Sequence, residues 1–300
     1  MKDLFGTDGV RGKANTYPIT PEICLRLGKA LARVFEASGH GSRRAVIGKD
    51  TRLSGYMLEN ALTSGMVSLG MDVYLVGPVP TPALAHLTRS MVAACGAMIT
   101  ASHNPAEDNG IKIFGNDGFK LSDDMQQQVT ELVLGAEIEA AHIANDKIGK
   151  AHRIEDARGR YIEFVKSTVP DLDLHGLDVV VDCANGAGYL IAPIILRELG
   201  ANVTKFAAAP DGYNINLGCG ATQPAALGAE VRRVGADLGI AFDGDADRVV
   251  FCDDRGEVVN GDCILGLCAM GMRDEGKLRA DAMVVTEMSS LGLHKAMQAE

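Results

Sequence analysis

The sequence predicts an α/β protein built from repeated domains, each with a mixed or largely parallel sheet. One helix-to-strand junction recurs three times: an apolar helical stretch ends at Gly70, Gly200 or Gly235, and a strand begins directly after it. Glycine there suits the left-handed backbone that ends many helices. The last two junctions are 35 residues apart, about the length of one βαβ unit. A chain of 300 residues has room for about two domains of ~150 residues. We therefore expect two complete α/β domains and the start of a third.

The sequence marks the start of the first helix clearly. Thr20 suits the N-cap and Pro21 the first helical position, and apolar residues then recur at helical spacing as far as Gly39. Runs of apolar and β-branched residues alternate with a second helical stretch. They predict, in order, a strand at 45–48, a helix at about 57–69 and a strand at 71–76.

A polar stretch from Asn145 to Arg160 is expected to connect the first domain to the second, through a helix that reaches Val165. Four strands are then predicted in the second domain, at 177–181, 203–206, 238–242 and 249–252.

The last segment has the beginnings of a third unit. It contains a helix from about Gly261, a predicted strand at 282–286 and helical spacing from Leu291 onward. A segment of this length is too short to form such a core alone, so we expect a chain that stops inside its third domain. The predicted divisions are 1–152, 153–256 and 257–300.

The composition excludes several classes of protein. Asp and Glu number 39 against 29 Lys and Arg, a formal net charge of −10, which disfavours binding to nucleic acids and anionic membranes. The longest nearly apolar run, 263–272, is far shorter than the ~20 residues of a membrane span, and the first residues carry no apolar signal region. The seven cysteines are scattered without a C-x-x-C pair, which predicts a reducing cytoplasm rather than zinc sites or disulfides. We expect a cytoplasmic protein with no nucleic-acid or membrane partner.

Three carboxylates, Asp243, Asp245 and Asp247, follow a predicted apolar strand, at the end where open α/β sheets bind ligands. If the segment is extended, residues at this spacing project to one side. Three like charges so close repel one another unless a cation joins them, and oxygen ligands favour Mg²⁺ over Zn²⁺. An EF-hand fits poorly because Arg248 stands where that loop needs glycine. The alternative is a solvated acidic turn, which explains neither the spacing nor the adjacent arginine.

A hydroxyl and an imidazole follow another predicted strand end. Ser102 is placed as a nucleophile would be, but its neighbour His103 need not point toward it, so spacing alone favours a loop serine with an incidental histidine. No G-x-S-x-G elbow surrounds Ser102, which disfavours a hydrolase triad.

Three further segments are candidate binding elements. Lys112 points away from the face shared by Ile111 and Ile113, so it serves as an acid/base or phosphate ligand if the opposite face is a cleft, and as a solvated lysine otherwise. Arg11 lies in a glycine-rich stretch typical of an anion site. The loop at 185–188 is a candidate phosphate cradle, although no acidic residue ends the next strand as a dinucleotide site requires.

Four of these segments together resemble the motifs of the α-D-phosphohexomutase family. They are 6–12 (GTDGVRG), 100–105 (TASHNP), 109–112 (NGIK) and 243–248 (DGDADR), and they occur in the family's order across most of the chain. The stretches 210–216 and 219–222, and Phe5 before the first motif, favour the branch that acts on glucosamine phosphates.

The resemblance implies a role for each candidate. Ser102 would carry a phosphoryl group, and Asp243, Asp245 and Asp247 would hold one Mg²⁺ together with an oxygen of that phosphoserine. Lys112 would be the acid/base, Arg11 and His103 would support the phosphoserine, and Arg248 would face the substrate. The substrate would be a small phosphosugar, glucosamine 6-phosphate, converted to the 1-phosphate through glucosamine 1,6-bisphosphate, which would also prime Ser102. A homodimer is compatible with this family.

One departure limits what the resemblance implies. The family's sugar-binding loop and its C-terminal phosphate-binding domain are not found in this sequence, so we expect little activity from this chain alone. Activity on glucose or mannose phosphates is the nearest alternative. A haloacid-dehalogenase-type phosphatase with Asp243 as nucleophile, and a metal-binding fragment without catalysis, are alternatives of other classes.

Overall fold

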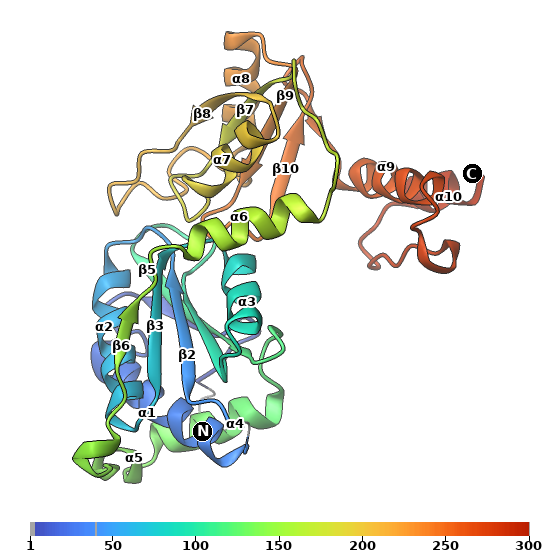
Figure 1. The fold of residues 1–300 in the computed structure, drawn as a ribbon. Helices are drawn as coiled ribbons and strands as arrows, with labels where there is room; N and C mark the ends of the chain where they lie inside the picture. The colour runs from blue at the N-terminus through green and yellow to red at the C-terminus, as the bar shows by residue number, and fades with distance from the viewer. Residues whose placement is uncertain (1–3, 40, 300) are drawn as a thin grey trace.

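The computed structural model describes residues 4–39 and 41–299 and contains two mixed sheets stacked end to end (Figure 1). In the first sheet β4, β2, β3 and β6 are parallel, and β5 and β1 continue it antiparallel beyond β4. The strands are β1 (Val10–Lys13), β2 (Arg44–Lys49), β3 (Asp72–Pro78), β4 (Cys95–Ile99), β5 (Asp108–Gly115) and β6 (Ala151–Arg153).

Helices cover both faces of this sheet. On one face, α1 (Pro21–Ala37), α2 (Ser54–Ser68) and α4 (Asp123–Leu134) enclose the larger apolar core, with the short α5 (Glu137–Ala140) beside α1. On the other face, α3 (Thr81–Ser90) packs with α6 (Ala157–Ser167) in a second core that also includes Ala187 and Ile191 of the next domain. The two domains therefore share one apolar core through α6, which lies between the sheets (Figure 1).

The second sheet has β8, β7 and β9 parallel, with β10 and β11 continuing it antiparallel. The strands are β7 (Asp178–Asp182), β8 (Asn202–Phe206), β9 (Leu238–Phe242), β10 (Val249–Cys252) and β11 (Val258–Val259). The helices α7 (Ile191–Glu198) and α8 (Pro224–Val234) cover opposite faces, because each packs against a different apolar cluster of the sheet. The predicted mixed α/β fold is confirmed.

The signals at the helix ends act as the sequence predicted. The Thr20 hydroxyl accepts a hydrogen bond from the Ile23 amide at 3.4 Å, with Pro21 as the first helical residue. At the three repeated junctions Gly70, Gly200 and Gly235 have φ of 87°, 102° and 69°, and each turns its helix toward the following strand without the steric cost of a side chain.

For the connecting segments, one expectation is incomplete and another is wrong. The polar stretch 145–160 is not only a connection, because β6 within it pairs in parallel with β3 and forms the edge of the first sheet. A strand with a single neighbour is largely exposed and can be made of polar residues, so the sequence carries no apolar pattern that would predict β6. The predicted strand at 282–286 is irregular, with Val284 96% exposed, because no strand lies alongside it among the described residues.

The segment after the second sheet is helical. It consists of α9 (Gly261–Asp274), the short 3-10 turn η2 (Arg279–Asp281) and α10 (Leu291–Ala299), which packs on α9. The divisions at 152/153 and 256/257 remain predictions. Within the part of the chain that the structure describes, no helix combines the length and apolar character that crossing a membrane requires.

The helices α1 and α2 approach closely where two glycines face each other, and this contact gives a stability prediction. A Cβ added to Gly65 would lie 2.1 Å from the carbonyl oxygen of Leu25, and one added to Gly28 would lie 2.3 Å from that of Leu62. We expect Gly65→Ala to lower the free energy of unfolding in urea by roughly 1–3 kcal/mol, because the helices must separate.

The matched control is Gly159→Ala on α6, where a Cβ meets no atom within 4 Å. Alanine should raise stability there by about 0.5–1 kcal/mol, the usual gain over glycine in an open helix position. Equal effects of the two substitutions would contradict the close-packing explanation.

Candidate active site

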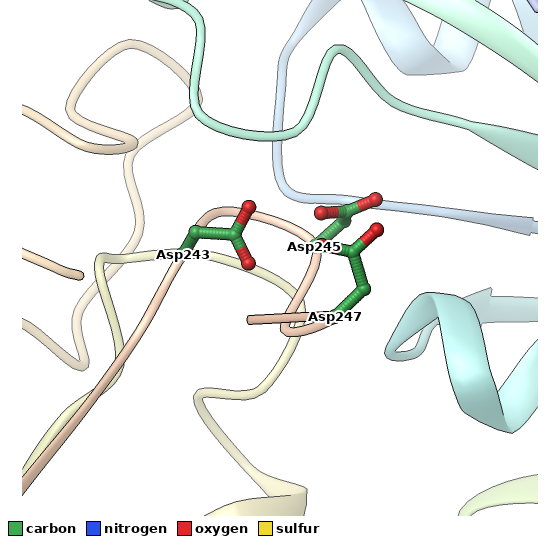
Figure 2. A group of neighbouring side chains, drawn as sticks. All are labelled: Asp243, Asp245 and Asp247. Atoms are coloured by element: carbon green, nitrogen blue, oxygen red, sulfur yellow. The ribbon is translucent and has the colours of Figure 1, made fainter. Parts of the chain in front are cut away.

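The three predicted carboxylates converge in the loop between β9 and β10 (Figure 2). Asp243, Asp245 and Asp247 each offer an oxygen, and these oxygens lie within 4.8 Å of one another. The loop is a tight turn rather than the extended segment assumed from the spacing: Ala246 has φ 53° and donates its amide to the Asp243 carbonyl at 3.0 Å. The carboxylates therefore meet because the chain turns.

These side chains fit a hard divalent cation. Asp243 and Asp245 are completely buried, and Oδ1 of Asp245 is buried without a hydrogen-bond partner. An unpaired buried carboxylate oxygen is costly unless it binds a cation or donor. Burial and the adjacent charge of Asp245 raise the pKa of Asp247 above its ordinary value, as expected where like charges crowd together. The donor set of three carboxylates is the kind that Mg²⁺ prefers.

Ser102 lies directly against this cluster, in the loop that follows β4. Its hydroxyl donates to Oδ2 of Asp243 at 2.7 Å, although 141 residues separate them in the chain. Arg248 donates from Nη2 to the Ser102 hydroxyl at 2.8 Å and also to Oδ2 of Asp243 at 2.9 Å, and it contacts Nδ1 of His103. The Ser102 hydroxyl and Nδ1 of His103 are 3.5 Å apart. The structure thus brings Ser102, His103, Asp243 and Arg248 into one group.

Lys112 reaches the other side of the carboxylates from the middle of β5. Ile111 and Ile113 point into the first core, and Lys112 projects from the opposite face, where Nζ donates to Asp245 at 2.7 Å and to Asp247 at 3.0 Å. Burial alone would lower the pKa of Lys112. The carboxylates of Asp245 and Asp247 have the larger effect, so the pKa of Lys112 is raised above its ordinary value. Lys112 is therefore protonated at neutral pH, and the same contact holds the pKa of Asp245 down against its burial.

Thr81 is a site residue that the sequence did not reveal. It begins α3, and its hydroxyl donates to Oδ2 of Asp245 at 2.6 Å while its amide donates to the Asp245 carbonyl at 2.9 Å. A helix N-terminus favours a nearby negative charge. The Thr-Pro pair in the sequence indicates a helix start, but nothing local shows that this start faces a loop 164 residues away.

Arg11 is near this group but does not join it. Its guanidinium pairs with Asp8 at 2.6 Å, and no hydrogen bond between Arg11 and Ser102 occurs among the described residues. Arg11 lines a cavity of about 460 Å³. A second cavity, of about 170 Å³, is lined by Lys112 and Asp247 and shares Asp8 and Gly9 with the first. The Arg11 side therefore adjoins the Lys112 side of the site.

The loop at 185–188 does not form the predicted phosphate cradle. Three of its four amides donate to carbonyls within the protein: Asn185 to Ala207, Gly186 to Cys183, and Ala187 to Gly244 at 2.8 Å. A Cβ on Gly186 would lie 2.3 Å from that same carbonyl. Gly186 allows this loop to pack directly against the carboxylate turn. This close packing explains the glycine there better than phosphate binding does.

Family models and curated relatives both place this chain among the phosphohexomutases. Residues 2–139 match domain I, and residues 159–256 match domain II, of the phosphoglucomutase/phosphomannomutase alpha/beta/alpha family. A phosphoglucosamine mutase of Cereibacter sphaeroides is 58% identical over 99% of this chain, and one of Geotalea daltonii is 52% identical over the same share. The chain spans 66% of the length of each of these relatives.

A solved structure gives the same indication. A phosphoglucomutase/phosphomannomutase family protein of Burkholderia thailandensis superposes with a TM-score of 0.78 at 26% identity, over 92% of this chain and 60% of that one. The chain therefore belongs to the phosphoglucomutase/phosphomannomutase family, the α-D-phosphohexomutases, as its sequence motifs predicted.

Proposed function

We propose that this chain carries the phosphoserine and metal-binding part of a phosphoglucosamine mutase, which interconverts glucosamine 6-phosphate and glucosamine 1-phosphate through a 1,6-bisphosphate. The observation that supports this most strongly is the contact between Ser102 and Asp243 at 2.7 Å, which joins a candidate phosphoryl carrier to a cluster of three carboxylates. The choice of glucosamine phosphates rests on the 58% identical relative that is named for them.

Each residue of this group would have its own task. Asp243, Asp245 and Asp247 would hold Mg²⁺ together with an oxygen of phosphorylated Ser102, and the ion would neutralise charge on the transferring group. The guanidinium of Arg248, already on the Ser102 hydroxyl at 2.8 Å, would bind an oxygen of a phosphoryl group there. His103 would support the same group beside it.

Proton transfer falls to Lys112. A lysine whose pKa is raised by two carboxylates holds a proton at neutral pH and is suited to donate it to a sugar oxygen as the phosphoryl group leaves that oxygen for Ser102. The hydroxyl of Ser102 would lose its own proton through its hydrogen bond to Asp243 as the new bond to phosphorus forms. In the reverse transfer the amine takes the proton from the attacking sugar hydroxyl, and the Ser102 oxygen regains a proton as the phosphoryl group leaves it. Arg11, in the adjoining cavity, would bind phosphate on the substrate side.

The test is the transfer of one phosphate to Ser102. After incubation with Mg²⁺ and glucosamine 1,6-bisphosphate, we expect intact-protein mass spectrometry to show one added phosphate, located at Ser102 by peptide analysis and stable in acid. Ser102→Ala should take up none, whereas the matched control Ser167→Ala, on the exposed side of α6, should be labelled normally.

Other outcomes would contradict the proposal. Phosphate found on Asp243 would support the dehalogenase-type mechanism, and no phosphate at all would support a non-catalytic metal-binding fragment. Faster labelling from glucose or mannose 1,6-bisphosphate than from the glucosamine compound would favour the phosphoglucomutase/phosphomannomutase alternative. A cytoplasmic location, a homodimer and the absence of nucleic-acid and membrane partners remain predictions.

A further inference from the structure

The loop that carries Ser102 is held by an arginine that lies wholly inside the protein. The side chain of Arg52 is 0% exposed and sits beneath residues 102–108. From Nη2 it donates to the carbonyls of Ser102 at 3.0 Å and Asn104 at 2.9 Å. From Nη1 it donates to the carbonyls of Asp108, at 3.1 Å, and Pro105. A single guanidinium thus binds four backbone carbonyls, three in the loop and one at the first residue of β5.

Asp50 completes this arrangement from below. It is fully buried and accepts from Nε of Arg52 at 2.9 Å, so all five donors of the guanidinium are used. Oδ2 of Asp50 also accepts from the Thr100 hydroxyl at 2.7 Å, and the Thr100 oxygen in turn accepts from the Ser102 amide at 2.9 Å. The amide and the carbonyl of Ser102 are therefore both fixed by the same buried pair.

This double restraint falls on a residue with an unfavourable backbone. Ser102 has φ 52°, the left-handed region that side chains other than glycine rarely adopt without support. The same backbone geometry directs its hydroxyl to Asp243. A fixed carbonyl on one side and a fixed amide on the other can keep Ser102 in this conformation.

Arg52 does not contact the groups that would take part in phosphoryl transfer. None of its hydrogen-bond partners belongs to the carboxylate cluster; they are loop carbonyls and Asp50. Asn216 of the second domain donates to the same two carbonyls, of Ser102 at 3.0 Å and Asn104 at 3.1 Å. The loop is therefore held from the first domain by a charged fork and from the second by one amide.

We propose that Arg52, oriented by Asp50, is a positioning residue that sets the hydroxyl of Ser102 for phosphoryl transfer. The proposal rests on the proposed function for its kinetic consequence. A planar fork that binds several carbonyls at once is a property of arginine, and lysine keeps the charge without that geometry. Loss of the fork should slow transfer to Ser102 and loosen the loop while leaving the metal site unchanged.

The test compares Arg52→Lys with Arg26→Lys. Arg26, on α1, also binds a carboxylate and a backbone carbonyl, those of Glu139 and Gly135, and neither belongs to the Ser102 loop. In Arg52→Lys we expect the amides of Asn104 and Asp108, which close turns within the loop, to exchange hydrogen at least about tenfold faster. The maximal rate of Ser102 labelling should fall at least about tenfold, with the half-saturating bisphosphate concentration and Mg²⁺ affinity unchanged. Arg26→Lys should behave as the wild type.

Several results would overturn the inference. Unchanged exchange of the loop amides in Arg52→Lys would show that the fork does not hold the loop, and a wild-type labelling rate would show that holding it does not matter. If Arg52→Lys does not fold, Asp50→Asn provides the same comparison with the arginine in place. Failure of the wild type to accept phosphate would refute the proposed function instead, and the exchange measurement would still decide whether Arg52 fixes the loop.

Discussion

Replacing Asp245 by asparagine is expected to weaken Mg²⁺ binding by about 100-fold or more. Loss of an outer contact to a metal ligand typically costs about 10–100-fold. Asp245 is a completely buried candidate ligand, and its Oδ1 has no hydrogen-bond partner among the described residues. The amide keeps the shape but removes a negative charge from a set of three. Isothermal titration calorimetry with Mg²⁺ would measure the change directly.

A control separates this effect from a general loss of negative charge. Asp146, in the exposed 3-10 turn η1 (Asn145–Lys147), also contributes one charge to the net −10, so Asp146→Asn should leave Mg²⁺ affinity unchanged. If Asp245→Asn bound Mg²⁺ as tightly as the wild type, the three carboxylates would not be the metal site, and their closeness would need another cause.

The balance of charge explains why three carboxylates, two of them buried, can lie so close together. Lys112, from the first domain, donates hydrogen bonds to Asp245 and Asp247. Arg248, from the carboxylate loop itself, donates to Asp243 and to the Ser102 hydroxyl. The site is therefore assembled at the contact of two domains, with Ser102 and Lys112 from one and the aspartates from the other. The distances between Ser102, Lys112 and the aspartates therefore depend on how the two domains pack against each other.

The sequence predicted the parts of the site that have a local signal. The spacing of the aspartates after an apolar strand indicated a cluster of carboxylates suited to a metal ion. The alternation around Lys112 indicated that this residue faces away from the core. Their convergence was predicted for the wrong reason, since the turn at Ala246 brings the carboxylates together. The roles of Ser102 and His103 came from family resemblance, because adjacency alone favoured an incidental histidine.

The residues that were missed have no local signal. Thr81, Arg52 and Asn216 resemble an ordinary helix start, turn arginine and loop asparagine, and their partners lie 164, 50 and 114 residues away. The same limit applies to the fold: junction glycines reveal their own left-handed backbone, but a polar edge strand such as β6 is recognisable only once β3 is beside it. Local chemistry is thus readable from the sequence, whereas long-range contacts are not.

A second large effect is expected at Gly244, where the carboxylate loop packs against the Ser102 loop. A Cβ there would lie 2.5 Å from the Ser102 carbonyl oxygen and 2.8 Å from Nδ2 of Asn216. That carbonyl cannot retreat easily, because Arg52 and Asn216 both bind it. In Gly244→Ala the carboxylate loop must therefore move away from Ser102 and lengthen the 2.7 Å contact with Asp243.

Because a displacement of about 1 Å can cost about 100-fold in rate, we expect Gly244→Ala to slow phosphate transfer to Ser102 by that order in a labelling time course. Mg²⁺ affinity should change much less, since the three aspartates move with the loop that carries them. Gly271→Ala on α9, where a Cβ meets no atom within 4 Å, is the matched control and should label at the wild-type rate.

A wild-type rate in Gly244→Ala would mean that the transfer step tolerates separation of the two loops. A loss of Mg²⁺ binding equal to that of Asp245→Asn would mean instead that the substitution disrupts the carboxylate turn, and the effect would then not report on the spacing between the domains.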